Sequence, residues 1–265
     1  TDLENWHKIA RNLAVWDYLA NFTNYLIPHP NEGTFGANIR LFAAGGVTSV
    51  FAQGDIGSAG CGDFVQLKAW VIAHLLWNPA LDERALTVEF LNGYYSPEAG
   101  ARLLMVIDRL RDRFAASGRR LGCYHADVNG WLTQREIGEL LQLFDAAEAA
   151  LPETDRAVYA ERLRRARLPF DLAYLLTPQA SAWNPALTES EYRKNLDLWR
   201  EMHDLYRRNE VVDLNEITPV AVLYERMPRM LAGPNALRRS GDVPEFCRNS
   251  RRFYEFSASD VELLR

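Results

Sequence analysis

Two short apolar runs, each ending abruptly in polar and glycine residues, constrain the fold of this 265-residue chain most strongly. The first contains Trp16-Asp17-Tyr18 and leads to Pro28-His29-Pro30-Asn31, and the second covers residues 47–55. Runs of this kind are typical of buried strands in an α/β sheet or barrel. Residues just beyond the carboxyl ends of parallel strands form the ligand-facing rim. The first candidates for a functional site are therefore Asp17, Tyr18, His29, Gln53 and Asp55.

Helical patterns dominate the rest of the chain. Apolar residues recur at helical spacing over 64–75 and stop at Asn78-Pro79, while Ser96-Pro97-Glu98 supplies an N-cap, a first-turn proline and a first-turn acid. Thr133-x-x-Glu136 and Thr188-x-x-Glu191 are capping-box patterns. The sequence predicts helices over residues 38–44, 64–75, 82–94, 97–116, 134–151, 153–167 and 189–209. The tail after Thr218 contains repeated Pro and Gly, which argues against long regular elements there.

The first 110 residues also carry a series of motifs in a fixed order. They are Trp16-Asp-Tyr, Pro28-His-Pro-Asn, Phe51-Ala-Gln-Gly-Asp, Leu75-Leu-Trp-Asn-Pro, Asp82, and Glu89-Phe90 followed by Gly93-Tyr-Tyr95. This series resembles the second half of the domain of unknown function 4838, which is grouped with glycoside hydrolase family 163. The resemblance implies a barrel glycosidase that acts on amino-sugar-containing glycans, in a secreted or periplasmic bacterial enzyme.

We therefore predict a mainly α fold with a minor β component. Residues 1–81 would form the last strand–helix units of a TIM-barrel-like glycosidase domain, and residues 82–265 a helical domain with an irregular tail. No Gly/Ser-rich linker marks the boundary. The upstream half of the same polypeptide would then be a partner of this chain.

Composition narrows the possible partners. With 30 Lys and Arg against 35 Asp and Glu, the net charge of −5 disfavours nucleic acid. The chain begins at Thr1 and contains neither a signal peptide nor a transmembrane span, so we expect any export signal to lie upstream. Cys61, Cys123 and Cys247 are odd in number and far apart, which leaves either one bridge or three free thiols.

Glycoside hydrolysis needs two carboxyl groups flanking the scissile bond. Asp17 and Asp55 each close an apolar run and could line one pocket, but an Asp at a strand end often only binds a loop amide. Barrel glycosidases similar to this one place the acid pair on middle strands, so the resemblance implies a pair upstream of Thr1 and leaves the catalytic residues unknown. Where similar sequences carry Glu before the Gln-Gly pair, this chain has Ala52.

Aromatic residues could supply flat surfaces for sugar rings. Trp16, Tyr18 and Phe51 lie where this is possible, although core packing is the alternative for Trp16 and Phe51. Alternation along a strand sends Trp16 and Tyr18 to the opposite side from Asp17. Trp70 and Trp77 fall in a predicted helix and are assigned to packing.

Two flanking prolines make the loop at His29 stiff, so its imidazole could meet a substrate hydroxyl or simply bind a backbone carbonyl. The glycine-rich segment 54–62 could approach a ligand closely, but no Gly-Lys-Ser/Thr follows it. Cys123-Tyr-His125-x-Asp127 lacks a second ligand pair for a metal, and no other cofactor motif is present. We therefore predict no metal and no cofactor.

Two functions of different class remain open. The chain is either the C-terminal part of a glycoside hydrolase-like enzyme that supplies the sugar-binding rim, inactive alone, or a non-catalytic glycan-binding or helical interaction module. In the first case the predicted substrate-binding residues are Trp16, Asp17, Tyr18, His29, Gln53 and Asp55. In the second, Asp17, His29 and Asp55 only stabilise loops.

Overall fold

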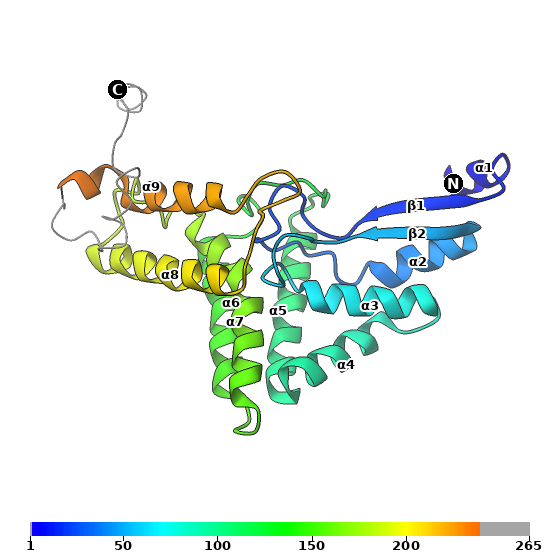
Figure 1. Cartoon of the computed structure of the whole chain (residues 1–265), viewed down its shortest axis with the longest axis horizontal. Helices are drawn as coiled ribbons and strands as arrows, with labels where there is room; N and C mark the ends of the chain where they lie inside the picture. Colours follow the sequence, from blue (N-terminus) through cyan, green and yellow to red (C-terminus); the bar gives the residue numbers. More distant parts are fainter. Residues whose placement is uncertain (1, 239–265) are drawn as a thin grey trace.

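The computed structural model describes residues 2–238 and is mainly helical, with a small parallel sheet (Figure 1). This confirms the predicted mainly α fold with a minor β component. The elements in chain order are α1 (Asp2–His7), β1 (Leu13–Tyr18), α2 (Phe35–Ala44), β2 (Val47–Gln53), α3 (Val65–Trp77), α4 (Glu83–Tyr95), α5 (Pro97–Ala116), α6 (Gln134–Ala149), α7 (Arg156–Leu175), α8 (Glu189–Arg208) and α9 (Ala221–Arg238).

The sheet lies at one end of the molecule, beside α2 and α3 (Figure 1). Strands β1 and β2 pair in parallel through the α2 crossover, with Trp16 opposite Phe51 and Tyr18 opposite Gln53. Only one face of the sheet is covered by helices within residues 2–238. The expectation of buried strands, with Trp16 and Phe51 in a core, is therefore wrong: their exposed fractions are 62% and 55%.

Helix starts follow the predicted local signals. The side chains of Asp82 and Ser96 accept hydrogen bonds from the backbone N–H groups of Ala85 and Ala99, so they cap α4 and α5. Thr133 and Thr188 form complete capping boxes at α6 and α8. These starts could be predicted because each cap involves residues only three positions apart.

Helix α1 was not predicted, and two later helices depart from their predicted course. Helix α7 does not end near Arg167 but continues through Pro169 to Leu175, and Phe170 and Leu172 are fully buried. Helix α9 occupies part of the tail expected to be irregular, despite Pro228 within it. In both cases burial of apolar side chains outweighs the local cost of proline. The rest of that tail, residues 239–265, lies outside the described residues.

Two apolar cores connect the strand units with the helices that follow. The first extends from Leu19 and α3 through α4, α5, α6 and α7, and Trp70 packs against it as predicted. The second joins Leu26 and Ile27, from the loop after β1, to α8 and α9. Trp77, which the helical pattern also predicts to pack, is instead 91% exposed at the end of α3. The domain boundary at residue 81 stays a prediction.

No helix among residues 2–238 is both long enough and apolar enough to cross a membrane.

Candidate functional site

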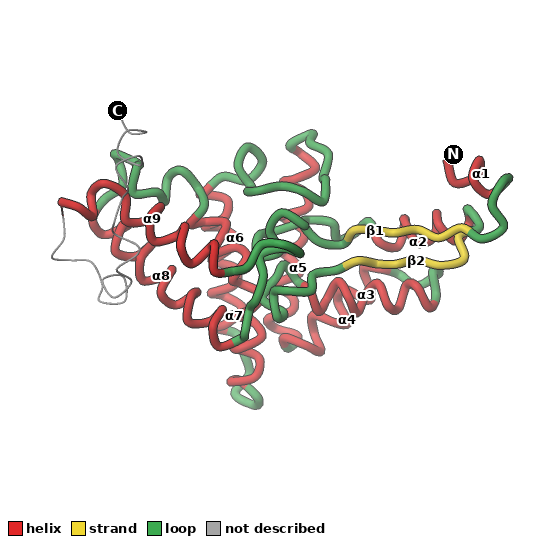
Figure 2. The backbone as a smooth tube through the Cα atoms, turned by 45° about the horizontal axis from the view of Figure 1, so that its top comes forward, coloured by secondary structure: helices red, strands yellow, loops and turns green. Residues whose placement is uncertain are grey.

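Loops from distant parts of the chain meet at the carboxyl ends of β1 and β2. In Figure 2 they gather between the sheet and the later helices. The backbone N–H of Phe22 donates to the carbonyl of Cys123 at 2.7 Å, and that of Tyr25 donates to Leu214 at 2.7 Å. The loop after β2 contacts the loop after α8, because the backbone N–H of Val212 donates to the carbonyl of Gly57 at 3.0 Å. The strand ends are therefore bordered by the loops after β1, β2, α5 and α8.

The uncovered face of the sheet carries a continuous set of aromatic rings. Trp16 and Phe51 pack edge to face with centroids 4.9 Å apart, and Trp16 lies 6.4 Å from Tyr18. Tyr18 continues the row to Phe22 at 5.0 Å and to Tyr124 at 6.4 Å. Trp16, Tyr18, Phe51 and Tyr124 are all exposed, so this aromatic surface is open to a ligand.

Gln53 connects the aromatic surface to an acid from the far end of the chain. Its side-chain oxygen accepts a hydrogen bond from the Trp16 indole N–H at 2.5 Å. Its side-chain NH₂ donates to the carboxylate of Glu216, in the loop after α8. The indole is thus oriented by a carboxamide that is itself held by a carboxylate.

A cavity of about 280 Å³ lies on the other side of the strand ends, against α3. Its apolar part includes Leu19, Ala52 and Ile72, and its polar part includes His29, Asp55, Asp63, Lys68 and Tyr25. Ala52, the residue before Gln53-Gly54, therefore faces this cavity and not the aromatic surface.

A buried ion cluster fixes the loop that carries His29. The Lys68 ammonium lies 2.6 Å from Asp63 and 3.4 Å from Glu32, and all three side chains are buried. Asp63 accepts from the backbone N–H of His29 at 2.9 Å, and Lys68 donates to the His29 carbonyl at 2.9 Å. Burial lowers the pKa of Lys68, but the charges of Asp63 and Glu32 outweigh it and raise the pKa overall. Burial also raises the pKa of Glu32 to about 7.

His29 is held neutral in this environment. Burial, followed by the charge of Lys68, lowers the pKa of His29 to about 2. Its ring stacks on His125 with centroids 5.3 Å apart, and its Nδ1 has no hydrogen-bond partner within the described part of the chain. A neutral imidazole can donate or accept one hydrogen bond at that atom.

Asp55 stabilises the loop that follows β2. One carboxylate oxygen accepts hydrogen bonds from the backbone N–H groups of Gly57 and Ser58, at 3.0 and 2.9 Å. Burial raises the pKa of Asp55. Its other oxygen is buried without a hydrogen-bond partner in residues 2–238. Asp55 therefore stabilises the strand-end loop through two backbone N–H groups.

Residues 1–108 match the family described as Domain of unknown function (DUF4838). The match confirms the resemblance to that domain and covers both strands, helices α1 to α4 and the first part of α5. No curated protein and no solved structure matches the chain.

The predicted residues of the DUF4838 segment divide between two places. Trp16, Tyr18 and Gln53 share the aromatic surface, whereas His29 and Asp55 line the cavity. Asp17 joins neither group: it lies opposite Ala52 on the helix-covered face of the sheet, where burial raises its pKa. Alternation along β1 correctly separated Asp17 from its aromatic neighbours. The hypothesis that Asp17 and Asp55 line one pocket does not gain support from this arrangement.

Several residues around the site were not predicted. Lys68 had a signal, because it falls on the apolar face of α3 next to Leu67 and Val71, and a buried cation needs acid partners. Tyr124, Asp213 and Glu216 come from loops beyond the DUF4838 segment. Their place at the site could not be predicted, because nothing in the sequence indicates which distant loops meet the strand ends.

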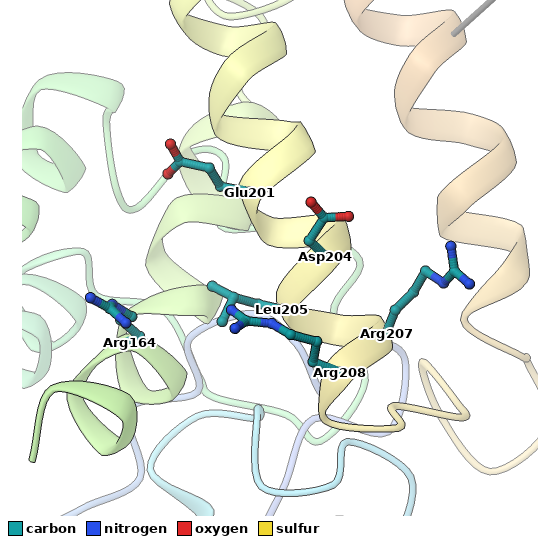
Figure 3. Close-up of a pocket in the computed structure, with 6 residues that line it drawn as sticks. All are labelled: Arg164, Glu201, Asp204, Leu205, Arg207 and Arg208. Atoms are coloured by element: carbon teal, nitrogen blue, oxygen red, sulfur yellow. The ribbon is translucent and has the colours of Figure 1, made fainter. Parts of the chain in front are cut away.

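A second hollow, of about 840 Å³, lies along α7 and α8 (Figure 3). It is lined by Arg164, Glu201, Asp204, Leu205, Arg207 and Arg208. In Figure 3 the Arg208 side chain extends toward the side of the hollow where Arg164 lies, with Leu205 between them. Since acids and bases are mixed and the lining has no aromatic ring, this hollow is a weaker candidate than the strand ends.

Among residues 2–238, no three His, Cys, Asp or Glu side chains are grouped so that they could hold a metal ion. Cys61 and Cys123 are free thiols, and burial raises the pKa of Cys61 to about 12. Cys247, the third cysteine considered for a bridge, lies outside the described residues.

Proposed function

We propose that this chain is the C-terminal part of a glycoside hydrolase-like enzyme and that its strand ends bind the glycan. The observation that carries the proposal is the aromatic surface of Trp16, Tyr18 and Phe51, which ends at the hydrogen-bonded Gln53 and Glu216. Flat exposed rings pack on the C–H faces of sugars, and nearby amide and carboxylate groups bind sugar hydroxyls. Amino-sugar-containing glycans are the proposed substrates.

The arrangement of the strands supports a barrel as the parent fold. β1, α2 and β2 form a parallel pair with a helical crossover, the unit from which TIM barrels are built. One face of the sheet is covered by helices while the other is open, and both outer strand edges are unpaired within residues 2–238. Further strand–helix units from the upstream part of the polypeptide would pair with these edges.

We place the catalytic carboxylate pair in that upstream part. Asp17 faces the helices, and Asp55 is engaged by backbone amides, so neither offers a free carboxylate on the aromatic surface. This chain would therefore bind the glycan, and the upstream part would supply the carboxylates that hydrolyse it. We also propose that the protein is secreted or periplasmic, as the family resemblance implies.

Hydrolysis of aryl glycosides and N-glycans by this chain and by the full-length gene product tests the proposal. We expect activity only in the full-length protein and a reduced kcat/KM when Gln53→Ala removes the link between Trp16 and Glu216. If neither protein hydrolyses any substrate while the chain still binds glycans, the enzyme proposal fails. The chain would then be a glycan-binding module.

A further inference from the structure

The aromatic surface has acidic surroundings that come from outside the DUF4838 segment. Glu216 is exposed and contacts Gln53 directly. Asp213 belongs to the same loop, whose backbone is hydrogen-bonded to Gly57 and Tyr25 at the strand ends. Both acids lie more than 100 residues beyond the end of the family match at residue 108.

The charges of Glu216 and Asp213 both act on the hydroxyl of Tyr25, which lies at the strand ends. Tyr25 lines the cavity and connects it to the aromatic row, since its buried ring lies 5.6 Å from that of Phe22. Burial raises the pKa of its hydroxyl, and the charges of Glu216, Asp55 and Asp213 raise it further. The negative charges therefore act together where the aromatic surface meets the loops. Lys68, the cation that lines the nearby cavity, is already engaged by Asp63 and Glu32.

We propose that Glu216, supported by Asp213, is a specificity-determining residue that makes the aromatic surface select neutral glycans over acidic ones. The carboxylate of Glu216 accepts hydrogen bonds from sugar hydroxyls, whereas a ligand carboxylate in the same place would be repelled and would lack a donor. Discrimination of this kind depends on a repulsive group as much as on an attractive one. The inference rests on the proposed glycan binding.

The test compares a neutral sugar with the same sugar carrying carboxylates in place of its 6-hydroxyl groups. N,N′,N″-triacetylchitotriose and its counterpart with 6-hydroxyl groups oxidised to carboxylates are titrated into the chain by calorimetry at low ionic strength. Because every oxidised ring is charged, the comparison does not depend on which ring reaches Glu216. We expect the neutral sugar to bind at least about fivefold more tightly, equivalent to about 1 kcal/mol.

Charge-removing variants identify the residue responsible. In Glu216→Gln the neutral-to-acidic affinity ratio should fall toward one, and Asp213→Asn should lower it less. Glu210→Gln, an exposed acid at the start of the same loop, should leave the ratio unchanged. Raising the salt concentration to about 1 M, where the Debye length is about 3 Å, should also lower the wild-type ratio.

The outcomes separate this inference from the proposed function. If the neutral sugar binds but the oxidised sugar binds equally well, or if Glu216→Gln leaves the ratio intact, only the selectivity inference is overturned. If neither sugar binds, the proposed glycan binding and the inference fall together.

Discussion

One buried cation, Lys68, holds the loop that carries His29 in place. Lys68 contacts Asp63 and Glu32 and also holds the backbone carbonyl of His29. Removing one partner of a buried ion cluster leaves uncompensated charge in a poorly solvating environment. This residue therefore links stability to the geometry of the site.

The variant Lys68→Met tests this link. It leaves the buried carboxyl groups of Asp63 and Glu32 without their cation, so the free energy of unfolding should fall by about 3–5 kcal/mol in urea denaturation. Lys194→Met, at an exposed position on α8, should change it by less than about 0.5 kcal/mol. Equal effects of the two substitutions would contradict the role assigned to Lys68.

The pH dependence of stability tests the neutral state of His29. Its pKa is lowered from 6.5 to about 2 in the folded protein, so the unfolded chain alone takes up a proton as the pH falls below about 6.5. Acidification from pH 7.5 to 5.5 should therefore destabilise the wild type by about 1.4 kcal/mol more than the non-titrating variant His29→Asn. Parallel pH profiles for the two proteins would show that His29 ionises normally.

At the scale of the elements, local chemistry could be predicted and tertiary packing could not. The caps at Asp82, Ser96, Thr133 and Thr188 each involve neighbours in sequence, and the structure has all of them. Helices α7 and α9 continue through prolines because buried apolar contacts with other helices stabilise them. The sequence predicts the positions of the two strands correctly. It does not predict that one face of them is exposed, because exposure depends on what covers the sheet.

The junction between two loops gives a prediction at this scale. A Cβ placed on Gly57 would lie 2.5 Å from the Cβ of Asp213, so Gly57→Ala should separate the loop after α8 from the loop after β2. We expect a loss of about 1–3 kcal/mol in stability, typical of overpacking. The matched control is Gly54→Ala, where nothing lies within 4 Å of the added carbon. Similar stability of both variants would argue against tight docking of these loops.

In the whole molecule, the helical region shapes the site as well as supporting it. Trp16, Tyr18 and Gln53 could be predicted because strand ends are readable in sequence. Glu216 and Tyr124 could not, because folding alone brings the loops after α8 and α5 to those ends. The site is thus a joint product of the DUF4838 segment and the helices that follow it.

Glycan binding by the aromatic surface is the central claim, and calorimetric titration of N,N′,N″-triacetylchitotriose into the chain tests it most directly. Trp16→Ala removes the most exposed ring of the strand surface, and Trp77→Ala removes an exposed tryptophan at the end of α3. We predict that Trp16→Ala raises the Kd at least about tenfold, or about 1.4 kcal/mol, while Trp77→Ala leaves it unchanged. Equal binding by wild type and Trp16→Ala, or no binding by the wild type, would contradict the claim.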